Sequence, residues 1–357
     1  MSASPPVVAS KPVPGPWLAL TQGDPAGIGP ETIVKAFELE PSLMTGVLVV
    51  GQPDVLRRAA QVVRQARGGG PAMRPVVVLS EPADLAQCPP HCLPVLDPGT
   101  PMPNGLPDWG RVSAQAGRQA ADSVLWAARA ALRGEVAGMV TAPLHKEALH
   151  AAGVSFPGHT ELLQAEAAAH AGVGLEAMPV RMMLANQELR TVLVSIHVSL
   201  RQAIDAVTYG NVLDTLRITQ DSLRRVLGRS PRIAVAGLNP HAGEGGLFGR
   251  EELDIIEPAV QAARALGAQV TGPVAPDTVY MRARRGEFDV VVAMYHDQGL
   301  IPVKYLGVEE GVNVTLGLPL VRTSPDHGTA FDIAGTGQAD PSSLIEALRM
   351  ARRLTHT

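Results

Sequence analysis

Three histidines that follow short apolar runs are the residues of this chain best placed to do chemistry. His197, His241 and His296 end the segments TVLVSIH, RIAVAGLNPH and DVVVAMYH. Apolar runs without strict alternation predict strands buried on both faces, as in parallel sheets. Because open α/β sheets bind ligands beyond the carboxyl ends of their strands, we expect the three imidazoles to converge on one crevice. Three protein nitrogens with open positions indicate a catalytic divalent-metal site, and a hydrogen-bonded core histidine is the alternative at each position.

Other candidates are polar residues in predicted turns. PGHTE places His159 and Thr160 at a helix start, where backbone N–H groups would bind phosphate or carboxylate unless Thr160 merely caps the helix. Lys304, one of only four lysines, lies in the turn segment LIPVKYLG. A lysine can carry a proton where an arginine cannot, although a solvated surface lysine is the alternative. Arg322, in a polar and turn-rich stretch, offers a bidentate contact to an anionic substrate group.

The elements that must position these side chains alternate between strand and helix from residue 17 onward. This alternation predicts an α/β fold with mainly parallel sheets. A length of 357 residues favours two domains. No clear linker separates them, so we expect domains that share strands or exchange chain. Residues 1–16 carry a proline every few residues and no apolar run, which predicts a disordered tail rather than a secretory signal.

Composition argues against several classes of partner. A net charge of −4 provides no excess positive charge to bind nucleic-acid phosphates, and 3% aromatic residues provide few rings on which bases could stack. No apolar run approaches the ~20 residues that span a bilayer, so no membrane association is expected. Cys88 and Cys92 are the only cysteines, too few for a disulfide framework, which favours a cytoplasmic location.

The glycine-rich segment GDPAGIGPE follows the first predicted strand without matching a nucleotide motif. Its spacing differs from G-x-G-x-x-G, and it lacks the Lys-Ser/Thr of a Walker A loop. A G-x-S-x-G elbow is absent as well. The sequence therefore predicts no Rossmann site, and GDPAGIGPE is either a tight strand-to-helix turn or a ligand-binding loop at a helix start.

Seven blocks of the chain carry a family resemblance. They are GDPAGIGPE, TAPLHKEALHAAG, FPGHTELL, GLNPHAGEGG, APDTV, AMYHDQGLIPVKYLG and GVNVTLGLPLVRTSPDHGTAFDIAGTG. In this order they resemble the 4-hydroxythreonine-4-phosphate dehydrogenase (PdxA) family of pyridoxal phosphate biosynthesis, from about residue 17 to the last predicted helix. HGTAFDIAGTGQADP also resembles the nucleotide loop of isocitrate and isopropylmalate dehydrogenases, which bind NAD without a Rossmann fold.

The resemblance implies an architecture and an assembly. We expect two α/β/α domains with mainly parallel sheets and an active-site cleft between them, in a non-Rossmann, isopropylmalate dehydrogenase-like fold. Approximate boundaries put residues 17–140 and 311–357 in one domain, which carries the nucleotide loop. Residues 141–310 form the middle domain, which carries the metal ligands and the dimer interface. The implied assembly is a homodimer whose metal sites take ligands from both subunits.

The resemblance also implies a reaction and a set of site residues. NAD or NADP would oxidise 4-phosphohydroxy-L-threonine at C3, and loss of carbon dioxide would give 3-amino-2-oxopropyl phosphate. By position, the metal ligands are His197, His241 and His296, and the substrate-binding residues are His159, Thr160, Lys304, Asn313 and Arg322. The nucleotide loop contributes His327, Gly328, Thr329 and Asp332. Lys304 is the expected proton carrier, with Asp277 a second candidate for acid/base chemistry or for orienting the lysine.

Several alternatives stay open. Relatives with the same motifs act on threonate or erythronate phosphates, or on dihydrodiols of aromatic acids. The three histidines also suit a metal-dependent hydrolase or aldolase, and the cleft suits a non-catalytic binding protein. Imidazole ligands favour zinc, while magnesium, cobalt and nickel remain open. The residues do not decide between NAD and NADP.

Overall fold

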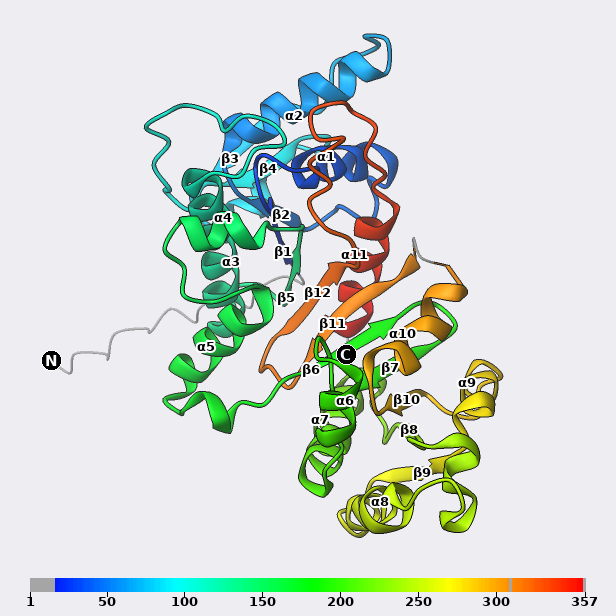
Figure 1. Cartoon of the computed structure of the whole chain (residues 1–357). Helices are drawn as coiled ribbons and strands as arrows, with labels where there is room; N and C mark the ends of the chain where they lie inside the picture. The colour runs from blue at the N-terminus through cyan, green and yellow to red at the C-terminus, as the bar shows by residue number, and fades with distance from the viewer. Residues whose placement is uncertain (1–16, 308–309, 356–357) are drawn as a thin grey trace, which may run out of the picture.

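Figure 1 shows the computed structural model of the chain, in which residues 17–307 and 310–355 are described. Within these residues, strands and helices alternate and build one twelve-stranded sheet with helices packed on both faces. The predicted α/β class is confirmed. The tail predicted to be disordered, residues 1–16, lies outside the described residues.

The strands are short, as expected from the short apolar runs that form them. They are β1 Leu18–Thr21, β2 Val47–Val50, β3 Val76–Leu79, β4 Leu93–Leu96, β5 Gly138–Thr141, β6 Arg181–Ala185, β7 Arg190–Leu193, β8 Arg232–Ala236, β9 Gln269–Val274, β10 Val290–Ala293, β11 Val312–Leu316 and β12 Val321–Pro325.

The helices begin and end at residues that favour helix termini. They are α1 Gly29–Leu39, α2 Pro53–Ala66, α3 Ala114–Leu132, α4 Lys146–Ala151, α5 His159–Ala171, α6 Leu200–Asp205, α7 Tyr209–Leu227, α8 Glu257–Ala265, α9 Pro276–Arg284, α10 His296–Tyr305 and α11 Ser342–Thr355. Short 3₁₀ segments are η1 Pro82–Gln87, η2 Leu175–Ala177 and η3 Pro240–Gly246, and η4 Glu252–Ile256 is a π-helical turn. Ser113 caps α3 with its side chain, and Gly172 and Gly228 end α5 and α7 in the left-handed conformation. None of the described helices is both long and apolar enough to cross a bilayer.

The sheet runs without interruption through the molecule. Its strand order is β3-β4-β2-β1-β5-β12-β11-β6-β7-β10-β8-β9. All neighbours are parallel except β12–β11, β11–β6 and β6–β7, which are antiparallel. The hairpin of β12 and β11 pairs with β5 on one side and β6 on the other, so it covers two strand edges that would otherwise be unpaired. The expected boundaries at residues 140 and 311 remain predictions.

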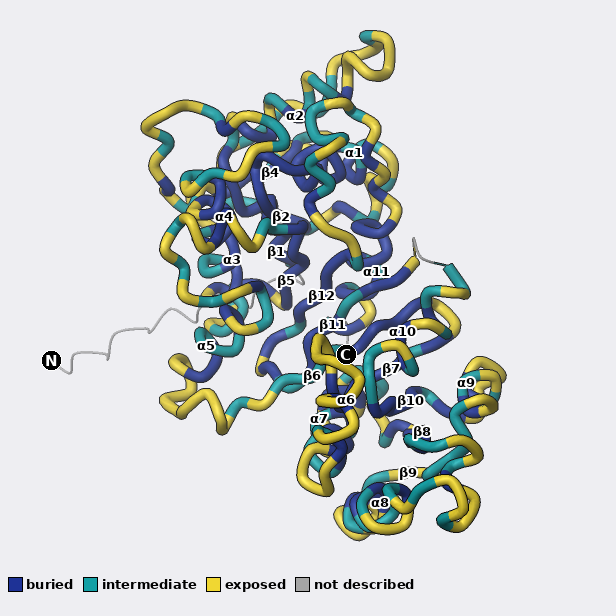
Figure 2. Tube along the Cα trace, in the orientation of Figure 1, coloured by how far each residue is buried: buried dark blue, intermediate teal, exposed yellow. Residues whose placement is uncertain are grey.

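The parallel strands carry continuous apolar runs because helices cover both of their faces. Leu18 and Leu20 of β1 belong to one buried cluster with residues of α1, whereas Ala19 between them packs with α3. Figure 2 shows the strands as the buried interior of the molecule. Strand β4 pairs with β3 and β2 inside the sheet. Prolines in and around this four-residue strand argue against a strand on pattern alone.

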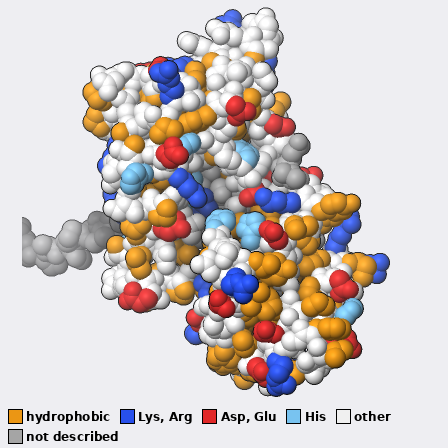
Figure 3. Space-filling view, in the orientation of Figure 1, with side chains coloured by type: hydrophobic (Ala, Val, Ile, Leu, Met, Phe, Trp, Pro, Cys, Tyr) orange, Lys and Arg blue, Asp and Glu red, His pale blue; other side chains and the backbone are white. Residues whose placement is uncertain are grey.

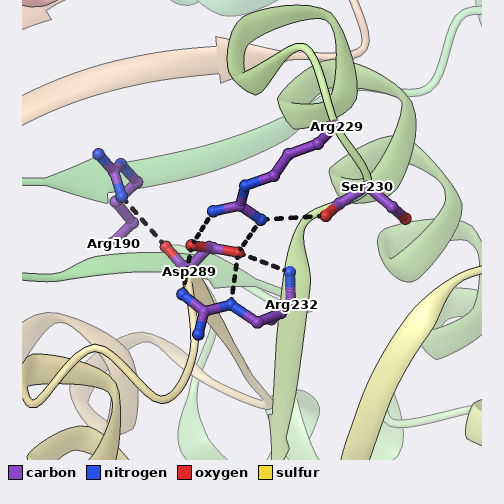
Figure 4. Close-up of polar contacts among 5 residues, drawn as sticks. All are labelled: Arg190, Arg229, Ser230, Arg232 and Asp289. Atoms are coloured by element: carbon purple, nitrogen blue, oxygen red, sulfur yellow. Dashed lines mark hydrogen bonds and ion pairs between the residues drawn. The ribbon is translucent and has the colours of Figure 1, made fainter.

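A carboxylate at the amino ends of the strands ties β8 to β10. Asp289, just before β10, accepts hydrogen bonds from the guanidinium groups of Arg229 and Arg232 and from the backbone N–H of Arg232 (Figure 4). Its carbonyl oxygen also accepts from Arg190 at the start of β7. Burial alone would raise the pKa of the Asp289 carboxyl, but these donors hold it well below its usual range.

Asp289→Asn is therefore expected to lower the free energy of unfolding by about 2 kcal/mol at neutral pH. Because the folded-state pKa is depressed, the carboxylate stabilises the fold above its ordinary pKa of about 4 and loses this effect as the pH falls further. Urea unfolding should show that the difference in unfolding free energy between the unmodified protein and Asp289→Asn decreases from about pH 6 toward about pH 3. The exposed Asp221→Asn is the matched control, and a difference that is independent of pH would contradict the assignment.

Candidate active site

A cavity of about 570 Å³ lies where the two halves of the sheet meet. Its walls come from the ends of β5 and β7, the starts of α5 and α10, and the strands β11 and β12. Most of the predicted site residues line it: His159, Thr160, His197, His296, Lys304, Asn313, Arg322, His327 and Gly328. Figure 3 shows histidine, basic and acidic side chains gathered at the middle of this face.

Two of the three strand-end histidines lie side by side. Strands β7, β10 and β8 are adjacent and parallel, as the three apolar runs predicted. The rings of His197 and His296 have centroids 5.7 Å apart. Nδ1 of His296 lies 2.7 Å from a carboxylate oxygen of Asp297. Burial, and then the charge of His296, lower the pKa of His197.

His241 is exposed and does not line the cavity of its own chain. It lies in η3 with a left-handed backbone (φ 53°), and its ring contacts Phe248 rather than the other two histidines. Asp277 is also exposed and outside the cavity, at the start of α9, which packs against η3. Among the described residues of one chain, no three His, Cys, Asp or Glu side chains gather closely enough to hold a metal ion.

Arg322 is a buried cation that forms no ion pair with a carboxylate of the described residues. Its side chain donates hydrogen bonds to the hydroxyl groups of Thr141 and Thr315, at 2.7–3.2 Å, and the residue is only 6% exposed. Burial lowers its pKa to about 10, partly opposed by the charge of Glu161. A buried charge normally has an ionic partner, so an anion is the missing component of this site.

The amino end of α5 borders the cavity beside Arg322. Helix α5 begins at His159 after Gly158, so the alternative that Thr160 caps the helix is wrong, because Thr160 lies inside the first turn. Nε2 of His159 is buried and has no hydrogen-bond partner in residues 17–307 and 310–355. Burial, and then the charge of Arg322, lower the pKa of His159 well below its usual range. Free N–H groups of the first turn, a neutral imidazole and a guanidinium together suit a phosphate or carboxylate.

Asp326 links two of the predicted substrate residues. One carboxylate oxygen lies 2.7 Å from Nζ of Lys304, and the other accepts a hydrogen bond of 2.9 Å from the side-chain amide of Asn313. Asp326 was absent from the predicted site, because no spacing rule joins it to a lysine on a distant helix. Its only sequence signal is its place in the quoted block next to His327.

The predicted nucleotide loop is fixed by side chains of α1. Glu31 accepts hydrogen bonds from the backbone N–H groups of Gly335 and Gly337, and Lys35 donates to the carbonyl oxygens of Gly337 and Ala339. These two α1 residues were also missed. They are one helical turn apart, so they share a face, but nothing in the sequence indicated what that face contacts.

Within this loop, the predicted cofactor residues differ in exposure. His327, Gly328 and Asp332 are exposed, whereas Thr329 is buried and its carbonyl oxygen accepts from the backbone N–H of Ile28. Residues 21–30, which include most of the glycine-rich turn, are all buried. The turn therefore supports the loop and is not itself an open ligand site.

Comparisons with known proteins agree with this geometry. A family model described as "Pyridoxal phosphate biosynthetic protein PdxA" matches residues 43–351. The chain is 51% identical over 337 residues to the 4-hydroxythreonine-4-phosphate dehydrogenase of Beijerinckia indica, with 94% of each protein covered. It is 45% identical over 339 residues to the D-threonate 4-phosphate dehydrogenase of Salmonella typhimurium, covering 94% of this chain and 98% of the relative. The crystal structure of 4-hydroxythreonine-4-phosphate dehydrogenase from Klebsiella pneumoniae superposes with a TM-score of 0.85 at 42% identity, covering 97% of this chain and 100% of that one.

Proposed function

Because the chain belongs to the PdxA family of pyridoxal phosphate biosynthetic proteins, we propose that it oxidises 4-phosphohydroxy-L-threonine at C3 with NAD or NADP. The resulting β-keto acid loses carbon dioxide and gives 3-amino-2-oxopropyl phosphate. The observation that carries this proposal is the anion site formed by Arg322 and the first turn of α5. A substrate with both a phosphate and a carboxylate supplies the negative charge that the site lacks.

Three residues near the cavity, Lys304, Asn313 and Asp326, suit the proton transfer that the reaction requires. The Asp326 carboxylate holds the ammonium group of Lys304 and the amide of Asn313 in fixed positions. After decarboxylation, C2 of the substrate must gain a proton, and Lys304 is the group that we assign to donate it. Asp277 lies outside this cavity, so any role there requires the partner subunit.

The loop at residues 327–332 suits a nicotinamide dinucleotide. Glu31 and Lys35 hold the backbone that follows this segment, at Gly335 and Gly337, and a Cβ added at Gly328 would meet no atom within 4 Å. That open space borders the cavity and leaves the backbone accessible to a ligand. We assign His327, Gly328, Thr329 and Asp332 to cofactor binding.

A homodimer would complete the metal site. His197 and His296 provide two neighbouring imidazoles, and His241 of the partner subunit would provide the third. Large apolar side chains flank these histidines and are exposed, including Val198, Leu200 and Leu247 at 51%, 60% and 73%. Figure 3 shows hydrophobic side chains over the lower part of this face. Such a surface favours burial against a second copy of the chain.

A bound divalent ion would polarise the C3 oxygen of the substrate, and a bound nicotinamide would accept the hydride. The residues of this chain orient the substrate. Arg322 and α5 would bind its anionic end, and Lys304 and Asn313 line the same cavity as the histidine pair.

D-threonate 4-phosphate is the second candidate substrate, because the Salmonella typhimurium relative named for it is 45% identical over nearly its whole length. It carries a hydroxyl group where 4-phosphohydroxy-L-threonine carries an ammonium group. The same anion site would hold either molecule.

The test is turnover by the purified protein, loaded in turn with zinc, magnesium and cobalt. The substrates are 4-phosphohydroxy-L-threonine, D-threonate 4-phosphate and D-erythronate 4-phosphate, each with NAD and NADP. We expect 4-phosphohydroxy-L-threonine to give the highest kcat/KM, with one carbon dioxide released per reduced nicotinamide. A higher kcat/KM for D-threonate 4-phosphate would establish the second candidate. Absence of reduced nicotinamide with every substrate would contradict the proposed function.

A further inference from the structure

The cavity carries more positive charge than its own carboxylates neutralise. Among the described residues, the lysine, arginine, aspartate and glutamate side chains that line it are the cations Lys146, Arg181, Lys304 and Arg322 and the anions Glu161 and Asp326. A cleft lined by an excess of one charge attracts ligands of the opposite charge. The proposed substrate carries two anionic groups, a phosphate and a carboxylate, and the site at Arg322 accounts for one of them.

Three of these four cations already have a role or a partner. Arg322 belongs to the anion site described above, and Nζ of Lys304 lies 2.7 Å from a carboxylate oxygen of Asp326. Arg181 donates hydrogen bonds to a hydroxyl group of α7 and to a backbone carbonyl oxygen. In the part of the chain that the structure describes, Lys146 forms no hydrogen bond or ion pair. Lys146 is therefore the cation of this cavity that can bind a second anionic group.

The backbone at Lys146 is held from two sides. Lys146 is the first residue of α4, and the ring of the preceding residue, His145, stacks on the ring of Phe331 with centroids 4.6 Å apart. Helix α4 also lies so close to α3 that a Cβ added at Gly117 would clash with the carbonyl oxygen of Ala148. The long lysine side chain thus reaches the cavity from a fixed backbone, which differs from the usual surroundings of a solvated surface lysine.

The position of Lys146 in the cavity matches the position of the substrate carboxylate. Burial lowers the pKa of His197 most, followed by the charges of His296 and Lys146, so the ammonium group is near the histidine pair. In the proposed reaction the C3 oxygen lies at this pair. The carboxylate is bonded to C2, on one side of C3, and the phosphate is bonded through C4, on the other side. When the phosphate occupies the site at Arg322, the carboxylate is the anionic group left for Lys146.

We propose that Lys146 binds the carboxylate of the substrate, while Arg322 and the first turn of α5 bind its phosphate. The ammonium group donates hydrogen bonds to the carboxylate oxygens and compensates their charge. Two cations, one for each anionic group, hold C3 between them beside the histidine pair. This inference rests on the proposed function and adds one binding residue to its substrate site.

The test is binding of two ligands, measured by calorimetry without nicotinamide so that no turnover occurs. The first is 4-phosphohydroxy-L-threonine, and the second is 3-amino-2-hydroxypropyl phosphate, which has a hydrogen atom in place of the carboxylate. Lys146→Met removes the charge and keeps the length of the side chain. We expect it to raise the Kd of 4-phosphohydroxy-L-threonine about 30-fold and to change the Kd of 3-amino-2-hydroxypropyl phosphate by less than about 2-fold.

Three further measurements serve as controls. Lys146→Gln, a second uncharged variant, should give the same result, and melting temperatures without ligand show whether each variant folds. Arg57→Met removes one positive charge from an exposed position of α2 outside the cavity, and it should leave both dissociation constants unchanged. The pyrophosphate of the dinucleotide is the other anion that could reach this lysine. Titration of NADH into Lys146→Met should give the Kd of the unmodified protein.

Each unexpected result has a distinct meaning. If the unmodified protein binds neither phosphorylated ligand, the proposed function is overturned and the carboxylate contact with it. If it binds them and Lys146→Met weakens both equally or leaves both unchanged, the carboxylate contact is overturned while the proposed function stands. Weaker binding of NADH with unchanged binding of 4-phosphohydroxy-L-threonine would assign the lysine to the pyrophosphate and would also overturn the contact. Equal weakening by Arg57→Met would do the same, because it would attribute the effect to the net charge of the protein.

Discussion

Replacing His241 with alanine is expected to abolish binding of the divalent ion and to lower kcat by more than about 100-fold, although this histidine lies outside the cavity of its own chain. The reason is the proposed assembly: the pair His197 and His296 provides two nitrogens, and a catalytic site needs a third. The ion content of the purified protein and its turnover are the measurements. Because His241 has a left-handed backbone, His241→Asn removes the imidazole with a residue that tolerates this conformation. The exposed His170→Ala is the control.

A mixed dimer tests whether the site is shared between subunits. When subunits carrying His241→Ala are paired with subunits carrying His197→Ala, one of the two sites regains a complete ligand set. The mixed dimer is therefore expected to recover about half of the turnover of the unmodified dimer. If His241 acted within its own chain, both sites would lack a ligand and the mixed dimer would stay inactive. That result would contradict the shared site.

The strand-end histidines show how far the sequence can be taken. The apolar runs before His197, His241 and His296 form β7, β8 and β10, and these strands are adjacent and parallel as expected. Two of the rings lie side by side, because residues that follow the carboxyl ends of adjacent parallel strands lie at the same edge of the sheet. The third does not, because η3 contains six residues with positive φ, and this backbone path leads His241 away from the cavity. Turn geometry of this kind is not encoded in hydrophobic periodicity.

Contacts between segments far apart in the chain could not be predicted from the sequence for a different reason. Asp326 binds Lys304, and Glu31 binds the backbone of the loop at Gly335, through contacts between residues far apart in the chain. Patterns at helical or strand spacing report on neighbours within one element and carry no signal for such pairs. The strand order also depends on such long-range contacts, since it is set by where the hairpin of β11 and β12 inserts.

Arg322→Met is expected to lower kcat/KM by about 1000-fold, because it removes the buried charge that the anionic substrate pairs with. The same change should leave the unliganded fold as stable as before or more stable. Within the part of the chain that the structure describes, the buried guanidinium has only the hydroxyl groups of Thr141 and Thr315 as hydrogen-bond partners. Its burial without an ionic partner is a cost to folding that methionine does not share. Activity and stability should therefore change independently or in opposite directions, as they do at residues kept for function.

Two measurements on Arg322→Met separate a binding role from a structural one. Inorganic phosphate should raise the melting temperature of the unmodified protein and have little effect on the variant, since the guanidinium is the main contact for the anion. Arg322→Lys keeps the charge but loses the bidentate geometry. Its kcat/KM should therefore fall between the values of the unmodified protein and Arg322→Met. If Arg322→Met unfolds at a much lower temperature yet still binds phosphate, Arg322 stabilises the fold around β12 and does not bind the substrate. Loss of phosphate binding with an undiminished melting temperature is the expected result, because a cation buried without an ionic partner stabilises the bound anion and not the empty fold.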